Sequence, residues 1–130
     1  KTIYWTAISG RNLYSLPTEI LSDFSKTEQE TEDAVVFEGQ HPACDGLAED
    51  EAGNIYFGAF EQQAIVKRLA GKNVYRLVSH DKENYVWPDG LAYRNGFLYV
   101  TLGQWNRLAG FNNGTDLRIP PYLIAKIKIK

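Results

Sequence analysis

Short runs of Tyr, Phe, Trp, Val and Ile, separated by Gly and Asn, recur along the whole chain. β-Branched and aromatic residues favour strands, and Gly and Asn between such runs are typical of tight turns. The clearest stretch predicts four strands that follow one another as a meander, at residues 45–50, 54–59, 64–69 and 74–78. The pattern therefore predicts a sheet built from consecutive hairpins.

The beginning of this meander occurs a second time. Residues 89–92 read Asp-Gly-Leu-Ala, as residues 45–48 do, and the two copies are separated by 89 − 45 = 44 residues. An apolar run at 97–101 follows the second copy, as 54–59 follows the first. Four short strands that recur at about this spacing are typical of the blades of a β-propeller. We therefore predict an all-β chain of about three four-stranded antiparallel blades.

Two of these blades are expected to be incomplete. The blade at residues 1–40 lacks an inner strand, the blade at 41–80 is complete, and the blade at 81–130 lacks an outer strand. Known propellers need about four to eight blades to close. We therefore expect a single partial propeller domain that is completed by further residues or by a partner chain.

The first blade carries an interruption between its second and third predicted strands. Its strands are expected at residues 1–7, 12–16 and 34–37. A capped helical turn at 18–23 and a charged, exposed insertion that continues to Asp33 are expected between the last two of these.

The composition and net charge limit the kinds of molecule that the chain is expected to bind. The chain has 130 residues, of which 44% are hydrophobic and 23% charged, as in a globular domain with a core. The 14 Lys and Arg against 16 Asp and Glu give a net charge of −2 without a basic stripe, so we expect no nucleic acid partner. No apolar run reaches the length of a membrane span, and we expect no membrane partner. Localisation stays open: a secreted or periplasmic protein would need a signal peptide upstream of Lys1.

Cys44 is the one cysteine, so the chain cannot form an internal disulfide, and we expect it to be a small buried side chain. The sequence also has no Gly-rich phosphate loop and no Gly-x-Ser-x-Gly motif. Nucleotide-dependent and acyl-enzyme mechanisms are therefore disfavoured.

Two blocks of sequence carry a family resemblance. Residues 44–68 contain Asp-Gly-Leu-Ala, Gly-Asn-Ile-Tyr-Phe-Gly and Gln-Ala-Ile, and residues 87–108 contain Trp-Pro-Asp-Gly-Leu-Ala, Leu-Tyr-Val and Asn-Arg-Leu. In this order the motifs resemble the yellow and major royal jelly protein family, in particular its bacterial branch labelled dopachrome tautomerase-related. The resemblance implies the C-terminal half of a six-bladed propeller. It also implies a small organic ligand in the central channel and an isomerase or tautomerase-like activity.

More distantly, the same strand starts resemble gluconolactonase and the senescence-marker lactonases. In those enzymes an Asp at this position binds a divalent metal beside a Glu and an Asn, which implies Asp45 as a ligand of calcium or zinc. The chain departs from them at Cys44, where those enzymes often have Pro, and their Glu would precede residue 1. A metal-dependent lactonase is therefore the alternative function, and no cofactor is assigned with certainty.

The candidate site follows from the propeller geometry, since the starts of inner strands converge on one channel. Asp45 and Asp89 occupy equivalent starts, where they could act as general acid and base or hold a hard cation. Alternatively, each accepts backbone N–H bonds at the start of its strand. The side chains that we expect to contribute to ligand binding are His41, Cys44, Trp87 and Trp105. For these the alternative is packing in the core, and a non-catalytic module completed by another chain is the third function considered.

Overall fold

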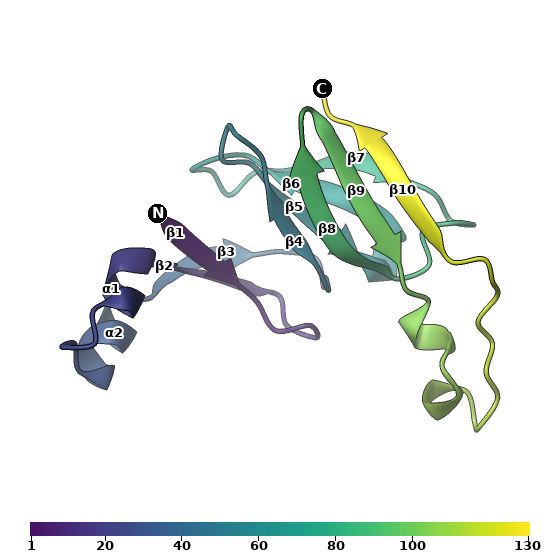
Figure 1. Ribbon diagram of the computed structural model, residues 1–130, viewed down its shortest axis with the longest axis horizontal. Coiled ribbons are helices and arrows are strands. Elements are labelled where there is room, and N and C mark those ends of the chain that lie inside the picture. The colour runs from purple at the N-terminus through teal and green to yellow at the C-terminus, as the bar shows by residue number, and fades with distance from the viewer. The chain divides into compact units, whose positions relative to one another are not determined.

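The computed structural model describes all residues from Lys1 to Lys130. They form two compact units, Lys1–His41 and Pro42–Lys130, which are described separately. Both are built mainly from antiparallel strands (Figure 1). The prediction of an all-β chain with antiparallel sheets of three or four strands is confirmed.

The first unit contains a three-stranded sheet in the order β1 (Thr2–Trp5), β2 (Asn12–Pro17) and β3 (Val36–Gln40). The register between β2 and β3 shifts at Leu13 and Tyr14. Trp5 stacks on Tyr14 with 5.9 Å between ring centroids, and Tyr14 contacts Phe37 at 5.7 Å. Cross-strand aromatic pairs of this kind stabilise a sheet.

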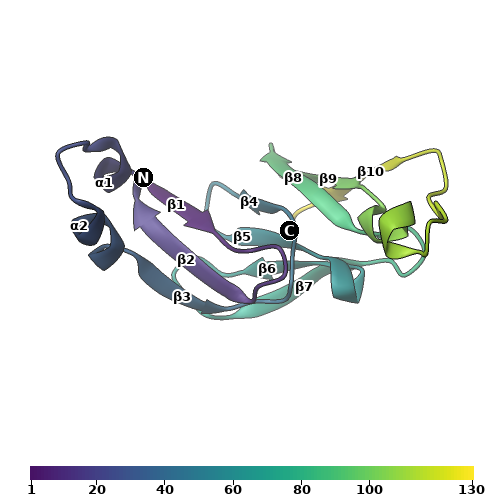
Figure 2. The same cartoon turned by 90° about the horizontal axis from the view of Figure 1, so that it is seen from below.

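Two short helices, α1 (Thr18–Ser22) and α2 (Glu28–Asp33), lie together at one end of this sheet (Figures 1 and 2). The predicted helical turn is present as α1. It lacks a side-chain cap, because its N-cap residue is Pro17, whose side chain cannot form a hydrogen bond. The charged insertion is exposed as expected. The helix α2 within this insertion was not predicted.

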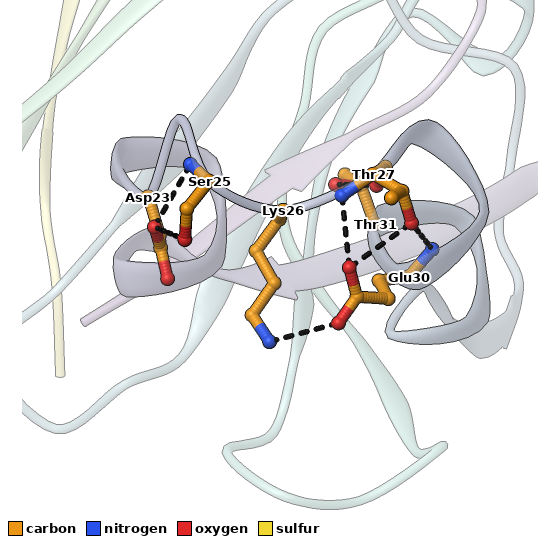
Figure 3. A network of polar contacts seen from close by, with 6 residues as sticks. All are labelled: Asp23, Ser25, Lys26, Thr27, Glu30 and Thr31. Atoms are coloured by element: carbon orange, nitrogen blue, oxygen red, sulfur yellow. Dashed lines mark hydrogen bonds and ion pairs between the residues drawn. The ribbon is translucent and has the colours of Figure 1, made fainter.

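A capping box explains why α2 forms in so charged a segment (Figure 3). The Thr27 hydroxyl accepts from the backbone N–H of Glu30 at 3.2 Å, and the Glu30 carboxylate accepts from the backbone N–H of Thr27 at 2.9 Å. Lys26 adds an ion pair to Glu30 at 3.1 Å. These contacts satisfy helix N–H groups that would otherwise lack partners.

The second unit begins with the predicted four-stranded meander, in the order β4 (Leu47–Glu49), β5 (Ile55–Ala59), β6 (Ala64–Arg68) and β7 (Tyr75–His80). A short 3₁₀ helix, Phe60–Gln62, connects β5 to β6. Gly53 and Gly71 turn the other two hairpins with φ angles of 79° and 62°, a region that glycine adopts without strain.

A second sheet follows, in which β9 (Phe97–Leu102) lies between β8 (Pro88–Arg94) and β10 (Leu123–Lys128). The long connection from β9 to β10 contains two 3₁₀ helices, Trp105–Arg107 and Ala109–Phe111. The sheets of the chain thus have three, four and three strands. That the two smaller ones lack an inner and an outer strand stays a prediction.

The core of the second unit lies between its two sheets. Its buried members are Tyr56, Ile65, Tyr85, Leu98, Val100 and Leu102. The two tyrosines keep their hydroxyls paired, with Tyr56 donating to Asp50 at 2.8 Å and Tyr85 bonded to Ser79 at 2.8 Å. Buried hydroxyls need such partners to offset the loss of water. This packing fixes β4 and β8 beside each other, where the candidate site lies.

Candidate functional site

The starts of β4 and β8 meet through glycine. A Cβ at Gly46 would overlap the carbonyl oxygen of Asp89, and a Cβ at Gly58 would lie 2.5 Å from the carbonyl oxygen of Pro88. The backbones can approach this closely only because both positions lack a side chain. The Asp-Gly motif therefore has a packing role, and the same contact brings Asp45 and Asp89 near each other.

Trp87 connects the two strand starts. Its indole Nε1–H donates to the Asp45 carboxylate at 2.7 Å, a short charge-assisted hydrogen bond. Its ring stacks on Phe60, with 4.1 Å between centroids and 11° between the planes. Trp87 also has a φ of 58°, a left-handed conformation that is uncommon for a bulky residue. The side chain is thus held by two contacts that fix its orientation.

Asp89 is half-buried beside Asp45. Burial raises the pKa of the Asp89 carboxyl, and the nearby charge of Asp45 raises it further. A Cβ on Gly103 would lie 2.9 Å from the Asp89 carboxylate, so this glycine leaves room for it. The pair therefore combines a carboxylate that accepts an indole hydrogen bond with a carboxyl that retains its proton more readily.

Cys44 is fully buried, as the sequence predicted. Burial, followed by the charge of Asp45, raises the pKa of its thiol to about 12. The thiolate, which is the reactive and metal-binding form, is therefore scarce at neutral pH. A role of Cys44 in ligand binding stays a prediction.

The remaining two predicted ligand-binding residues have other contacts. His41 belongs to the first unit, is 5% exposed, and places its Nε2 atom 2.8 Å from the Thr6 hydroxyl. Trp105 is 49% exposed and contacts Phe111, with 6.4 Å between ring centroids. Their roles in ligand binding also stay predictions.

A metal site would require several ligands around Asp45. No group of three or more His, Cys, Asp or Glu side chains in the chain is arranged to hold an ion. That Asp45 binds calcium or zinc stays a prediction. Separately, no helix of the chain is both long and apolar enough to span a membrane.

The sequence analysis missed Phe60. It follows β5 directly, in the connection to β6, and its ring covers Trp87. An aromatic residue just after a buried strand was the available signal, but neither repeat nor spacing linked it to Trp87, which directly precedes β8 of the other sheet in this unit.

Comparison with known proteins agrees with the fold and gives a family. The family model described as "Major royal jelly protein" matches residues 1–115. A solved β-propeller structure, titled "Crystal structure of Nidogen/Laminin Complex", matches with a TM-score of 0.59 and 13% sequence identity. The match covers 82% of this chain but 38% of that one, and at this identity it shows the fold alone. A search of the curated proteins found no match.

Proposed function

The chain belongs to the major royal jelly protein family, and from that premise we propose that it binds a small organic ligand at Asp45, Trp87 and Asp89. The observation that supports this most is the Trp87 hydrogen bond to Asp45, which holds an acceptor beside Asp89 at the starts of β4 and β8. In small-molecule sites a few precisely placed polar groups, set among apolar and aromatic side chains, fix the orientation of the ligand.

The chemistry of Asp45, Trp87 and Asp89 indicates which kind of ligand they can bind. Two carboxyl groups provide mainly hydrogen-bond acceptors and negative charge, so the ligand carries hydroxyl or amine donors. Catechol, with two adjacent hydroxyls on a flat ring, is a suitable probe.

We further propose that the pair catalyses a tautomerisation. Such a reaction removes a proton from one atom of the ligand and adds a proton at another, with no change in oxidation state. One carboxyl group of the pair accepts the first proton and the other supplies the second, and the raised pKa of Asp89 favours Asp89 as the group that supplies it. Proton exchange with solvent then restores both groups.

Calorimetric titration with catechol tests the binding proposal. We expect Asp45→Asn and Asp89→Asn each to weaken binding about 10-fold or more, since hydrogen bonds to charged groups contribute on that scale. Asp116→Asn is the control, because Asp116 pairs with Arg118 in the β9–β10 connection. Unchanged affinity for catechol in both site variants would contradict the assignment of Asp45 and Asp89 as ligand-binding residues.

Turnover is tested separately with dopachrome, by the loss of its visible absorbance. Tautomerisation predicts a rate that falls in both site variants but not in Asp116→Asn. Binding of catechol without any turnover of dopachrome would favour the non-catalytic binding module.

We also propose a partner for the second sheet. The strand β10 pairs with β9 alone, and its Ile124 is 69% exposed. An edge strand presents unpaired backbone groups that can pair with another strand. The proposed partner is the remainder of a propeller or a second copy of this chain.

A further inference from the structure

A cavity of about 290 Å³ lies in the Pro42–Lys130 unit where β9 ends and β10 begins. Its walls include the apolar side chains of Val86, Leu102, Pro121 and Leu123. The polar side chains of Gln104 and Arg107 also face it. None of the lining residues belongs to the Asp45, Trp87 and Asp89 group.

Gln104 gives this cavity a fixed wall. Gln104 is only 7% exposed. Its side-chain amide forms hydrogen bonds with both the N–H and the carbonyl group of Ile119, further along the β9–β10 connection. Its Nε2 donates to the Ile119 carbonyl at 2.8 Å, and its Oε1 accepts from the Ile119 N–H at 2.9 Å. The amide thus replaces a pair of backbone hydrogen bonds and holds the two ends of the connection together.

The same amide orients Arg107. Its Oε1 atom accepts a hydrogen bond from Arg107 Nη1 at 2.9 Å. The backbone of Arg107 is held as well, since its N–H donates to the Gln104 carbonyl at 2.9 Å and its carbonyl accepts from Leu117 at 2.9 Å. The guanidinium is therefore prepositioned, which reduces the entropy lost when a ligand binds.

Arg107 has no carboxylate partner among the ion pairs of the chain. A guanidinium has five N–H donors in a rigid fork, and the contact with Gln104 uses one nitrogen. A planar carboxylate matches the rest of that fork, and buried apolar walls such as Val86 and Leu102 strengthen the attraction by excluding water.

We propose that this cavity binds a small monocarboxylic acid with an apolar tail. The carboxylate pairs with Arg107, and the tail lies against Val86, Leu102 and Leu123. The volume lies at the lower end of the range for small-molecule pockets, which favours a free acid over a peptide.

Isothermal titration of the chain with 4-methylpentanoate tests this proposal, with 4-methylpentanamide as the neutral analogue of the same shape. We expect saturable binding of the acid and about 10-fold or more weaker binding of the amide. Arg107→Gln should weaken binding of the acid by a similar factor. Arg94→Gln is the matched control, because Arg94 is exposed at the far end of β8. The affinity of this variant for the acid should stay unchanged.

Arg107→Lys provides a second variant. It keeps the positive charge and a donor for the Gln104 amide but loses the planar fork that matches a carboxylate, so we expect weaker binding of the acid in a chain whose circular dichroism is unchanged. Equal binding of acid and amide overturns the proposal, as does full affinity in Arg107→Gln or no binding of the acid at millimolar concentration. Tighter binding of the tripeptide Ala-Ala-Leu than of the acid would contradict the proposal of a free acid and would indicate a peptide as the ligand.

Discussion

At the scale of single residues, the Trp87 side chain has two separable functions, the stack on Phe60 and the hydrogen bond to Asp45. Trp87→Phe retains an aromatic ring and removes the donor. We expect a loss of about 1.5 kcal/mol in the free energy of unfolding, the lower end for a hydrogen bond to a charged group because Asp45 is only half-buried. Urea denaturation measures this change. Trp105→Phe is the control and should change stability by less than about 0.5 kcal/mol, and equal losses in both variants would contradict the role of the indole N–H.

Asp89 is expected to make stability depend on pH. Its folded-state pKa is raised, so the folded chain binds this proton more tightly than the unfolded chain does. Ionisation of Asp89 therefore lowers stability as the pH rises from the ordinary Asp value, 3.8, through the raised one. Asp89→Asn should remove this decrease. The stability of the variant relative to the parent should therefore be higher at pH 7 than at pH 3. Urea denaturation across pH 3 to 7 checks it, and parallel pH profiles for both proteins would contradict it.

At the scale of elements, the contact of β4 with β8 depends on Gly46. Gly46→Ala forces a methyl group into the Asp89 carbonyl, where two backbones would have to separate, so we expect a loss of more than about 2 kcal/mol. Gly110→Ala is the matched control, because no atom lies within 4 Å of a Cβ there. Thermal unfolding distinguishes the two, and similar stability of both variants would show that the sheets do not meet as described.

The helix α2 depends on its capping box. Thr27→Ala removes the acceptor for the Glu30 N–H and should destabilise the helix by about 1 kcal/mol, which amide hydrogen exchange at Thr31 measures. The backbone N–H of Thr27, followed by Lys26, lowers the pKa of Glu30 from 4.5 to about 2. This contribution is therefore present above pH 4.5 and is lost as the pH falls towards 2. Protection at Thr31 that is unchanged by the mutation and by acid would contradict the role of the box.

The strands were predictable because their turns are local. Gly53 and Gly71 adopt the positive φ angles that Gly-containing turns predict, and β4 to β7 lie within a few residues of the expected ranges. The strand expected at 34–37 is found at 36–40, since α2 continues to Asp33 and its C-cap, Ala34, still has a helical backbone conformation. The helix α2 was missed because it has no apolar periodicity, although its Thr-x-x-Glu motif was visible.

The candidate site was predictable only in part. The repeat placed Asp45 and Asp89 at equivalent strand starts, and the structure brings them near each other. The Phe60 ring that stacks on Trp87 could not be found in this way. This contact joins residues that are far apart in the sequence, and it depends on how the two sheets pack.

At the scale of the whole molecule, the proposed pairing of β10 with a second copy predicts association that depends on concentration. Ile124→Lys places a charge on the exposed edge, a substitution that discourages edge-to-edge pairing, and should shift the chain toward the monomer. Sedimentation velocity at several concentrations measures the shift. Lys128→Gln is a control on the same strand. A parent chain that is monomeric at all concentrations would leave the remainder of a propeller as the proposed partner of β10.

The central claim is that Asp45, Trp87 and Asp89 form the binding site for a small donor-bearing ligand. The most direct test is to follow the Trp87 indole N–H by ¹H–¹⁵N NMR during titration with catechol, with Trp105 as the internal reference. We expect a saturable shift of the Trp87 resonance that Asp45→Asn abolishes, with the Trp105 resonance unchanged. A Trp87 resonance that does not move, or one that moves equally in Asp45→Asn, would contradict it.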